Sequence, residues 1–117
     1  MNSMEEVANI VVPKALALLP CRAVIAVAIM HDGCLEVRSW DLNPDKNFSD
    51  EVHDTKEHTE NLRRLAARYA VEQLSLIRDG FLTNPFSYKL DDDTVVTLVT
   101  SPWHIGLQQQ VITKMKE

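Results

Sequence analysis

Four potential metal ligands, His53, Asp54, Glu57 and His58, form the densest cluster of chemically active side chains in the sequence. On a helix, Asp54 and His58 would share one face, as two ligands of a metal ion can. His53 and His58 are poorly spaced for one ion, and Asp54 with Glu57 also fits a helix-capping box. We therefore interpret the cluster as the solvated start of a helix, and we expect no metal or cofactor.

A cysteine and a histidine, Cys34 and His31, face each other across a predicted hairpin turn. These are the residue types of a nucleophile and its base. A reactive thiol needs an electropositive environment, however, and the acidic residues Asp32 and Glu36 flank this one. We interpret the pair as ordinary turn residues and Cys21 as a small buried hydrophobic residue. Since no nucleophile with an oriented base is evident, we expect no enzyme activity.

Two charged clusters are candidate ion-binding sites. The aspartates 91–93 offer oxygen ligands for a hard cation, but a calcium loop also needs further ligands and a turn glycine. We therefore interpret them as a solvated hairpin turn. Arg63, Arg64 and Arg68 form a basic patch on the longest predicted helix. We expect this patch to pair with nearby glutamates, and contact with an anion or an acidic partner is the alternative.

The composition is that of a small globular protein. With 117 residues, 45% of them hydrophobic and 25% charged, the chain is expected to fold as one domain, residues 1–117. The net charge of -5 argues against nucleic acid as a partner. Apolar runs are shorter than the ~20 residues of a membrane span. Two cysteines make no disulfide framework and the N-terminal segment is acidic, so we expect a cytoplasmic protein that does not contact membranes.

Helical periodicity and turn signals predict the first three elements. A capping box at Ser3 begins a helix in which Pro13 lies opposite the apolar stripe. A kinked continuous helix fits this pattern, and two shorter helices are the alternative. Asp32-Gly33 predicts a type I′ turn between strands 22–30 and 34–40, the second of which is expected nearer an edge of the sheet.

A long helix is predicted over residues 54–80. Asp54 is its expected N-cap, and Gly80 is expected to end it in a Schellman motif. The polar, acidic connection before it, Asp41–Asp54, has a length that is usually functional or disordered. The main apolar stripe of the helix is predicted to comprise Leu62, Leu65, Ala66, Tyr69, Leu76 and Ile77, with Gln73 in its middle.

A second hairpin, with strands 86–90 and 94–100, and a last helix beginning at Pro102 complete the chain. The expected fold is an α+β domain, in which three helices pack on an antiparallel sheet of about four strands from two hairpins. This order of elements resembles that of the roadblock/dynein light chain family, whose members are small, dimeric and non-catalytic. The resemblance concerns element order, no residue motif carries it, and the second hairpin is one strand short of the family pattern.

Two helices carry more apolar surface than one buried side requires. On the central helix, Ala67, Val71 and Leu74 form a second apolar stripe, and on the last helix Ile105 and Ile112 lie opposite Leu107 and Val111. Either the monomer buries both sides, or the second stripe contacts another chain. With the neighbouring arginines, the predicted interface comprises Arg64, Ala67, Arg68, Val71, Leu74, Ile105 and Ile112.

Two functional hypotheses follow. The first is a small non-enzymatic regulatory protein that self-associates, as a dimer, and masks or bridges a macromolecular partner in the manner of an inhibitor or adaptor. The acidic charge and the Asp41–Asp54 connection favour a partner with a basic surface. The second is a binding module for a small, anionic molecule, held between sheet and helix or at a subunit interface. Its predicted contacts are Trp40, Arg64, Arg68 and Trp103.

Overall fold

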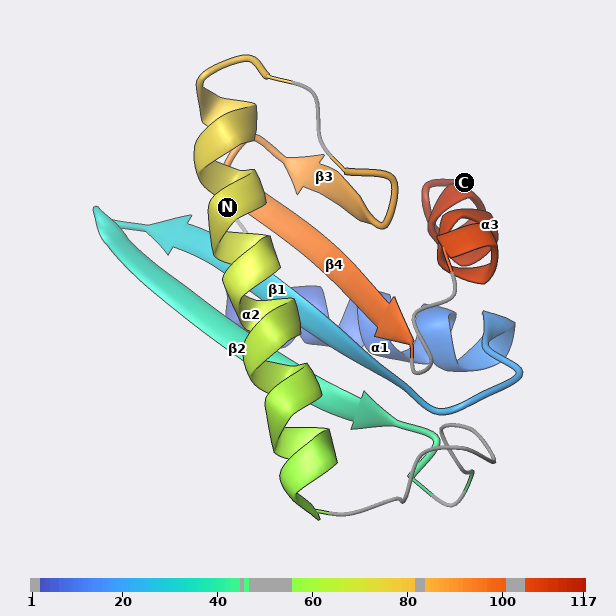
Figure 1. The fold of residues 1–117 in the computed structure, drawn as a ribbon. Helices are drawn as coiled ribbons and strands as arrows, with labels where there is room; N and C mark the ends of the chain where they lie inside the picture. The colour runs from blue at the N-terminus through green and yellow to red at the C-terminus, as the bar shows by residue number, and fades with distance from the viewer. Residues whose placement is uncertain (1–2, 45, 47–55, 82–83, 101–104) are drawn as a thin grey trace.

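The computed structural model describes residues 3–44, 46, 56–81, 84–100 and 105–117. They form three helices and four strands in the order α-β-β-α-β-β-α, which confirms the α+β fold (Figure 1). The elements are α1 (Met4–Leu18), β1 (Ala23–His31), β2 (Cys34–Leu42), α2 (Lys56–Arg78), β3 (Ser87–Asp91), β4 (Thr94–Thr100) and α3 (Ile105–Met115).

The four strands form one antiparallel sheet in the order β2-β1-β4-β3. The helix α2 crosses one face of the sheet, and α1 and α3 lie on the other (Figure 1). β1 is interior and its residues are buried on both faces from Ala23 to Ile29. β2 is an edge strand, as its alternation of apolar and polar residues predicts.

The hairpin between β1 and β2 has the predicted turn. Asp32 and Gly33 both have positive φ, 51° and 77°, which is the conformation of a type I′ turn. The register places His31 opposite Cys34 and Ile25 opposite Trp40, as expected from a two-residue loop. β2 continues two residues beyond the predicted end at Trp40 and finishes at the buried Leu42.

Each face of the sheet has its own apolar core. Beneath α2 lie small and branched side chains, including Ala26 and Ala28 of β1 against Ala66 and Ala70 of α2. The core on the other face is larger and contains Val7, Val11, Ala15, Ile25, Val27, Leu98, Val111, Ile112 and Met115. The two helices α1 and α3 therefore complete a core that α2 does not contact.

The first helix is continuous over Met4–Leu18, so the alternative of two shorter helices is wrong. The Ser3 hydroxyl caps it by accepting the backbone N–H of Glu6 at 3.2 Å. Pro13 lies within the helix on its exposed side, where the missing N–H and the ring disturb no packing. The continuous helix with its apolar stripe toward the core is therefore confirmed.

The predicted apolar face of α2 is wrong at two positions. Leu74 was expected on the outer stripe, yet it is 3% exposed and belongs to the core. Leu76 was expected in the main stripe, yet it is 37% exposed. The physical reason is that Ala66 and Ala70 are small enough to let the helix approach β1 closely, which turns the line of residues at 62, 66, 70 and 74 toward the sheet.

The end of α2 agrees with the prediction. Gly80 has a positive φ of 84°. Its N–H donates to the carbonyl of Ile77 at 3.0 Å, and the N–H of Phe81 donates to the carbonyl of Leu76 at 2.9 Å. These two bonds define a Schellman motif. The expected N-cap, Asp54, lies outside the described residues, as does most of the Asp41–Asp54 connection.

The last helix is anchored by a buried glutamine that the sequence interpretation missed. Gln108 is fully buried, donates to the carbonyl of Leu98 at 3.2 Å and accepts from the Thr100 hydroxyl at 3.1 Å. It shares a helical stripe with Val111 and Ile112, so the prediction that Ile112 faces away from Val111 is wrong. In the sequence, the helical spacing of residues 108, 111, 112 and 115 was the signal that could have identified this buried side of the helix.

Candidate interaction surface between α2 and the edge strand β2

The candidate metal ligands do not form a described site. His53 and Asp54 lie outside the described residues, and Glu57 is exposed at the start of α2. Within the described ranges, no group of three histidine, cysteine, aspartate or glutamate side chains is placed to hold a metal ion. At the second hairpin, Asp91 accepts the N–H of Asp93 at 2.9 Å, which is the local bond of a turn. The ammonium of Lys89 lies 2.6 Å from Asp92 and lowers the pKa of that carboxyl through a hydrogen bond and its charge.

The two thiols lie in different environments. Cys34 is exposed at the start of β2, opposite His31. Cys21 is half-buried, and burial raises its pKa, while the charge of Lys46 partly opposes that rise. A raised pKa lowers the thiolate fraction at neutral pH, and the thiolate is the reactive form.

We therefore expect Cys34 to react before Cys21 when the folded protein is treated with a thiol-alkylating reagent at neutral pH. Peptide mapping over time measures the two rates separately. A Cys34→Ser variant should lose the fast phase, and unfolding the protein should bring Cys21 to the rate of a free thiol. Equal rates in the folded protein would contradict this assignment.

The predicted ligand-binding residues are not brought together. Trp40 packs against the core on the α1 side of the sheet, whereas Arg64 and Arg68 are exposed on α2, which covers the opposite side. Trp103 lies outside the described residues. Arg68 pairs with Glu72 at 3.0 Å, as the solvated-face interpretation predicts. The described members of this set therefore do not converge on one ligand.

The predicted interface residues divide into two groups. Leu74 and Ile112 are 3% and 1% exposed, so at these two positions the chain itself covers the second apolar stripe. Ala67 and Val71 are half-buried on α2, and Ile105 is 46% exposed on α3. The helix that carries Ile105, α3, packs on the opposite side of the sheet from α2. The surface that remains near α2 centres on Val71.

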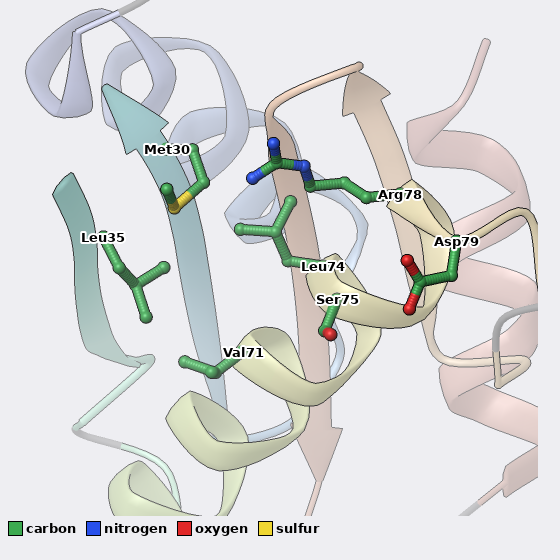
Figure 2. Close-up of a pocket in the computed structure, with 7 residues that line it drawn as sticks. All are labelled: Met30, Leu35, Val71, Leu74, Ser75, Arg78 and Asp79. Atoms are coloured by element: carbon green, nitrogen blue, oxygen red, sulfur yellow. The ribbon is translucent and has the colours of Figure 1, made fainter. Parts of the chain in front are cut away.

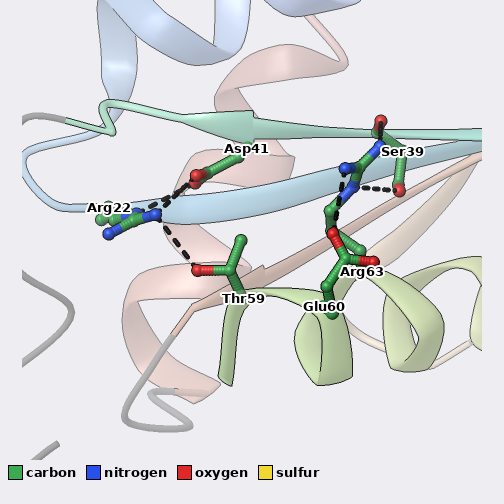
Figure 3. Close-up of polar contacts among 6 residues, drawn as sticks. All are labelled: Arg22, Ser39, Asp41, Thr59, Glu60 and Arg63. Atoms are coloured by element: carbon green, nitrogen blue, oxygen red, sulfur yellow. Dashed lines mark hydrogen bonds and ion pairs between the residues drawn. The ribbon is translucent and has the colours of Figure 1, made fainter. Parts of the chain in front are cut away.

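Polar contacts tie the N-terminal half of α2 to the hairpin (Figure 3). The guanidinium of Arg22 makes two bonds to the carboxylate of Asp41, at 3.0 and 2.6 Å, and a third to the hydroxyl of Thr59 at 3.1 Å. Arg63 donates to the hydroxyl of Ser39 at 3.0 Å and to its backbone carbonyl at 3.1 Å. These bonds hold α2 close to the C-terminal half of β2.

A groove with both apolar and polar lining lies between the C-terminal half of α2 and the first hairpin. Figure 2 shows Met30 and Leu35 of the hairpin facing Val71 and Leu74 of α2, with Arg78 and Asp79 at the helix end. The groove has a volume of about 460 Å³. Leu35 is 48% exposed, and its partner across the hairpin, Met30, is partly buried. The described part of the chain therefore leaves an open groove in which Leu35 is the most exposed apolar side chain.

The free edge of β2 runs beside this groove. β2 pairs with β1 on one side, and no other described strand pairs with it. The outer edge of a strand presents unpaired N–H and C=O groups that a further strand can bond. The groove and the strand edge together form what we call the α2–β2 surface, defined by Leu35, Val37, Val71, Ser75 and Arg78.

In the part of the chain that the structure describes, no helix has the length and apolar character to cross a membrane. Comparison of the chain with protein-family models, with curated proteins and with solved structures gave no match.

Proposed function

We propose that this chain is a small, non-enzymatic, cytoplasmic interaction protein that self-associates and binds or masks a macromolecular partner. The observation that carries the proposal is the α2–β2 surface, where a groove that exposes Leu35 lies beside a free strand edge. Contiguous exposed apolar surface is costly in water and marks contact sites for other chains. A free edge adds main-chain hydrogen bonds to such a contact.

The charge of the chain supports a basic partner. The net charge is -5, and opposite charge on a partner accelerates encounter and selects among competing surfaces. At the groove itself, Arg78 and Asp79 place one charge of each sign beside Ser75 and the four apolar lining residues. We therefore expect apolar and polar contacts at the groove to supply the affinity, and the net negative charge of the chain to make association depend on salt.

Replacing Val71 with glutamate tests the proposal. Val71 is half-buried and lines the groove, so a carboxylate there would be desolvated by any chain that covers the groove. We expect the wild-type protein to show a dimeric mass by sedimentation and light scattering, and the variant to dissociate at least tenfold more readily. A partner captured from the native host by the wild-type protein should be lost by the same variant.

The matched control is Ile10→Glu. Ile10 is 51% exposed on α1, on the other side of the sheet, so this change adds the same charge at an apolar surface position away from the groove. We expect its mass and its partner binding to equal those of the wild type. A wild-type protein that stays monomeric at its highest soluble concentration would rule out self-association.

The groove also favours a second candidate function, the binding of a small molecule. Its volume of about 460 Å³ falls within the range of ligand pockets, and Arg78 at its end suits an anionic group. The ligand site would then lie at the groove rather than at Trp40 and Arg64. A thermal-shift screen against nucleotides and metabolites separates the two functions. A ligand that stabilises the wild type and the Ile10→Glu variant, but not the Val71→Glu variant, would favour this candidate.

A further inference from the structure

The backbone groups on the free edge of β2 belong to its odd-numbered residues. The N–H of Met30 donates to the carbonyl of Asp93, so the even-numbered residues of β1 direct their N–H and C=O groups toward β4. The odd-numbered residues of β1 therefore bond β2, where the register pairs them with even-numbered residues such as Glu36 and Arg38. It follows that Leu35, Val37 and Ser39 direct their backbone groups outward.

The side chains along this edge alternate between charged and uncharged. Glu36 and Arg38 lie on the α1 side of the sheet, where their side chains are 51% and 52% exposed. Leu35, Val37 and Ser39 lie on the α2 side. The edge thus presents one negative and one positive side chain on the same face, on either side of Val37.

This pattern is complementary to itself in one antiparallel register. A two-fold axis through Val37 would place Glu36 of each copy opposite Arg38 of the other, and opposite charges directly across an antiparallel pair are favourable. An axis through Glu36 would instead place two glutamates opposite each other. An axis through Arg38 would place two arginines opposite each other. The outward backbone groups of the two copies face each other only where an odd-numbered residue of one copy lies opposite an odd-numbered residue of the other. A two-fold axis that passes through a residue of β2 meets this condition.

We infer that two copies of this chain pair through β2 about a two-fold axis at Val37, which joins their sheets into one. The inference rests on the self-association proposed above and specifies its geometry. The axis is perpendicular to the sheet, so both α2 helices lie on one face and both grooves adjoin the junction. The carbonyl of Ser39 already accepts from Arg63, and its second lone pair remains available for the N–H of Leu35 of the second copy.

Charge reversal tests the pairing. Glu36→Arg gives a chain with two positive side chains on this face, and Arg38→Glu gives a chain with two negative ones. We expect each variant alone to dimerise at least tenfold more weakly than the wild type, and an equimolar mixture of the two to form a heterodimer at least as tight as the wild-type dimer. Sedimentation of each sample, with one variant carrying a fluorescent label, measures these masses. Loss of the Glu36–Arg38 contact of 3.8 Å within one chain cannot explain tight association in the mixture, because both variants lose that contact.

Cysteine cross-linking tests the register in a background with Cys21→Ser and Cys34→Ser. Residues opposite each other in a hydrogen-bonded pair have Cα atoms about 5.5 Å apart, which suits a disulfide. Val37→Cys should therefore form a covalent dimer under mild oxidation. Leu35→Cys and Ser39→Cys, each alone, should not cross-link, whereas a mixture of the two should. Non-reducing electrophoresis reports each outcome.

The outcomes separate this inference from the proposed function. A dimeric wild type whose charge variants fail to associate in the mixture, or whose Val37→Cys variant fails to cross-link, would overturn the pairing through β2 and leave self-association intact. A wild type that is monomeric at every concentration would overturn both.

Discussion

Replacing Asp41 with alanine is expected to lower the free energy of unfolding by about 3 kcal/mol, the lower end of the range for removing one partner of a buried ion pair, because the Asp41 side chain is 21% exposed. Arg22 is 7% exposed, and Asp41 accepts two of the hydrogen bonds of its guanidinium (Figure 3). Without the carboxylate, the guanidinium loses both of these bonds and keeps its bond to Thr59. Urea denaturation followed by circular dichroism measures the loss.

Two controls define the cause of this loss. Glu72→Ala removes the exposed partner of Arg68 and should cost under about 1 kcal/mol, as surface ion pairs do. The double variant Arg22→Met with Asp41→Leu should be more stable than Asp41→Ala, because it removes both charges and keeps apolar volume. If Asp41→Ala were as stable as Glu72→Ala, the Arg22–Asp41 ion pair would not hold the hairpin against α2.

Replacing Ile25 with alanine is expected to lower the free energy of unfolding by about 2 to 5 kcal/mol. Ile25 is fully buried in β1, between Trp40 of β2 and Leu98 of β4. Its removal would leave a cavity in the core that α1 and α3 cover, where neighbouring strands on both sides limit collapse. Denaturant unfolding measures the change.

The milder change Ile25→Val should cost about 0.5 to 1.5 kcal/mol, because it removes a single methylene group. Leu16→Ala provides the surface control, since Leu16 is 41% exposed on α1 and leaves no cavity when shortened. A loss for Ile25→Ala no greater than that for Leu16→Ala would show that this face of the sheet is loosely packed.

Local signals in the sequence determined most of the elements. The Asp32-Gly33 turn fixed the register of the first hairpin, because two residues with positive φ allow one tight connection. Ser3 and Gly80 marked the ends of two helices, because orphan backbone groups there need a cap. These features depend on residues close together in the chain, so the sequence by itself determined them.

Tertiary packing decided which side of each helix is buried. Helical periodicity places Leu74 and Leu76 about 200° apart but does not say which of them faces the sheet. The close approach of Ala66 and Ala70 to β1 buries Leu74 and exposes Leu76. On α3, Gln108 makes hydrogen bonds to β4, and the side of the helix that carries Gln108 also buries Ile112.

The α2–β2 surface was likewise decided by the tertiary structure. Its members come from the first hairpin and from the end of α2, and no sequence spacing relates Leu35 to Val71. Their proximity depends on the strand order and on the polar bonds that hold only one half of α2 against β2. The sequence determined the strands, the turn and the helix ends, because these depend on near neighbours. The exposed groove depends on contacts between distant segments, so only the folded chain reveals it.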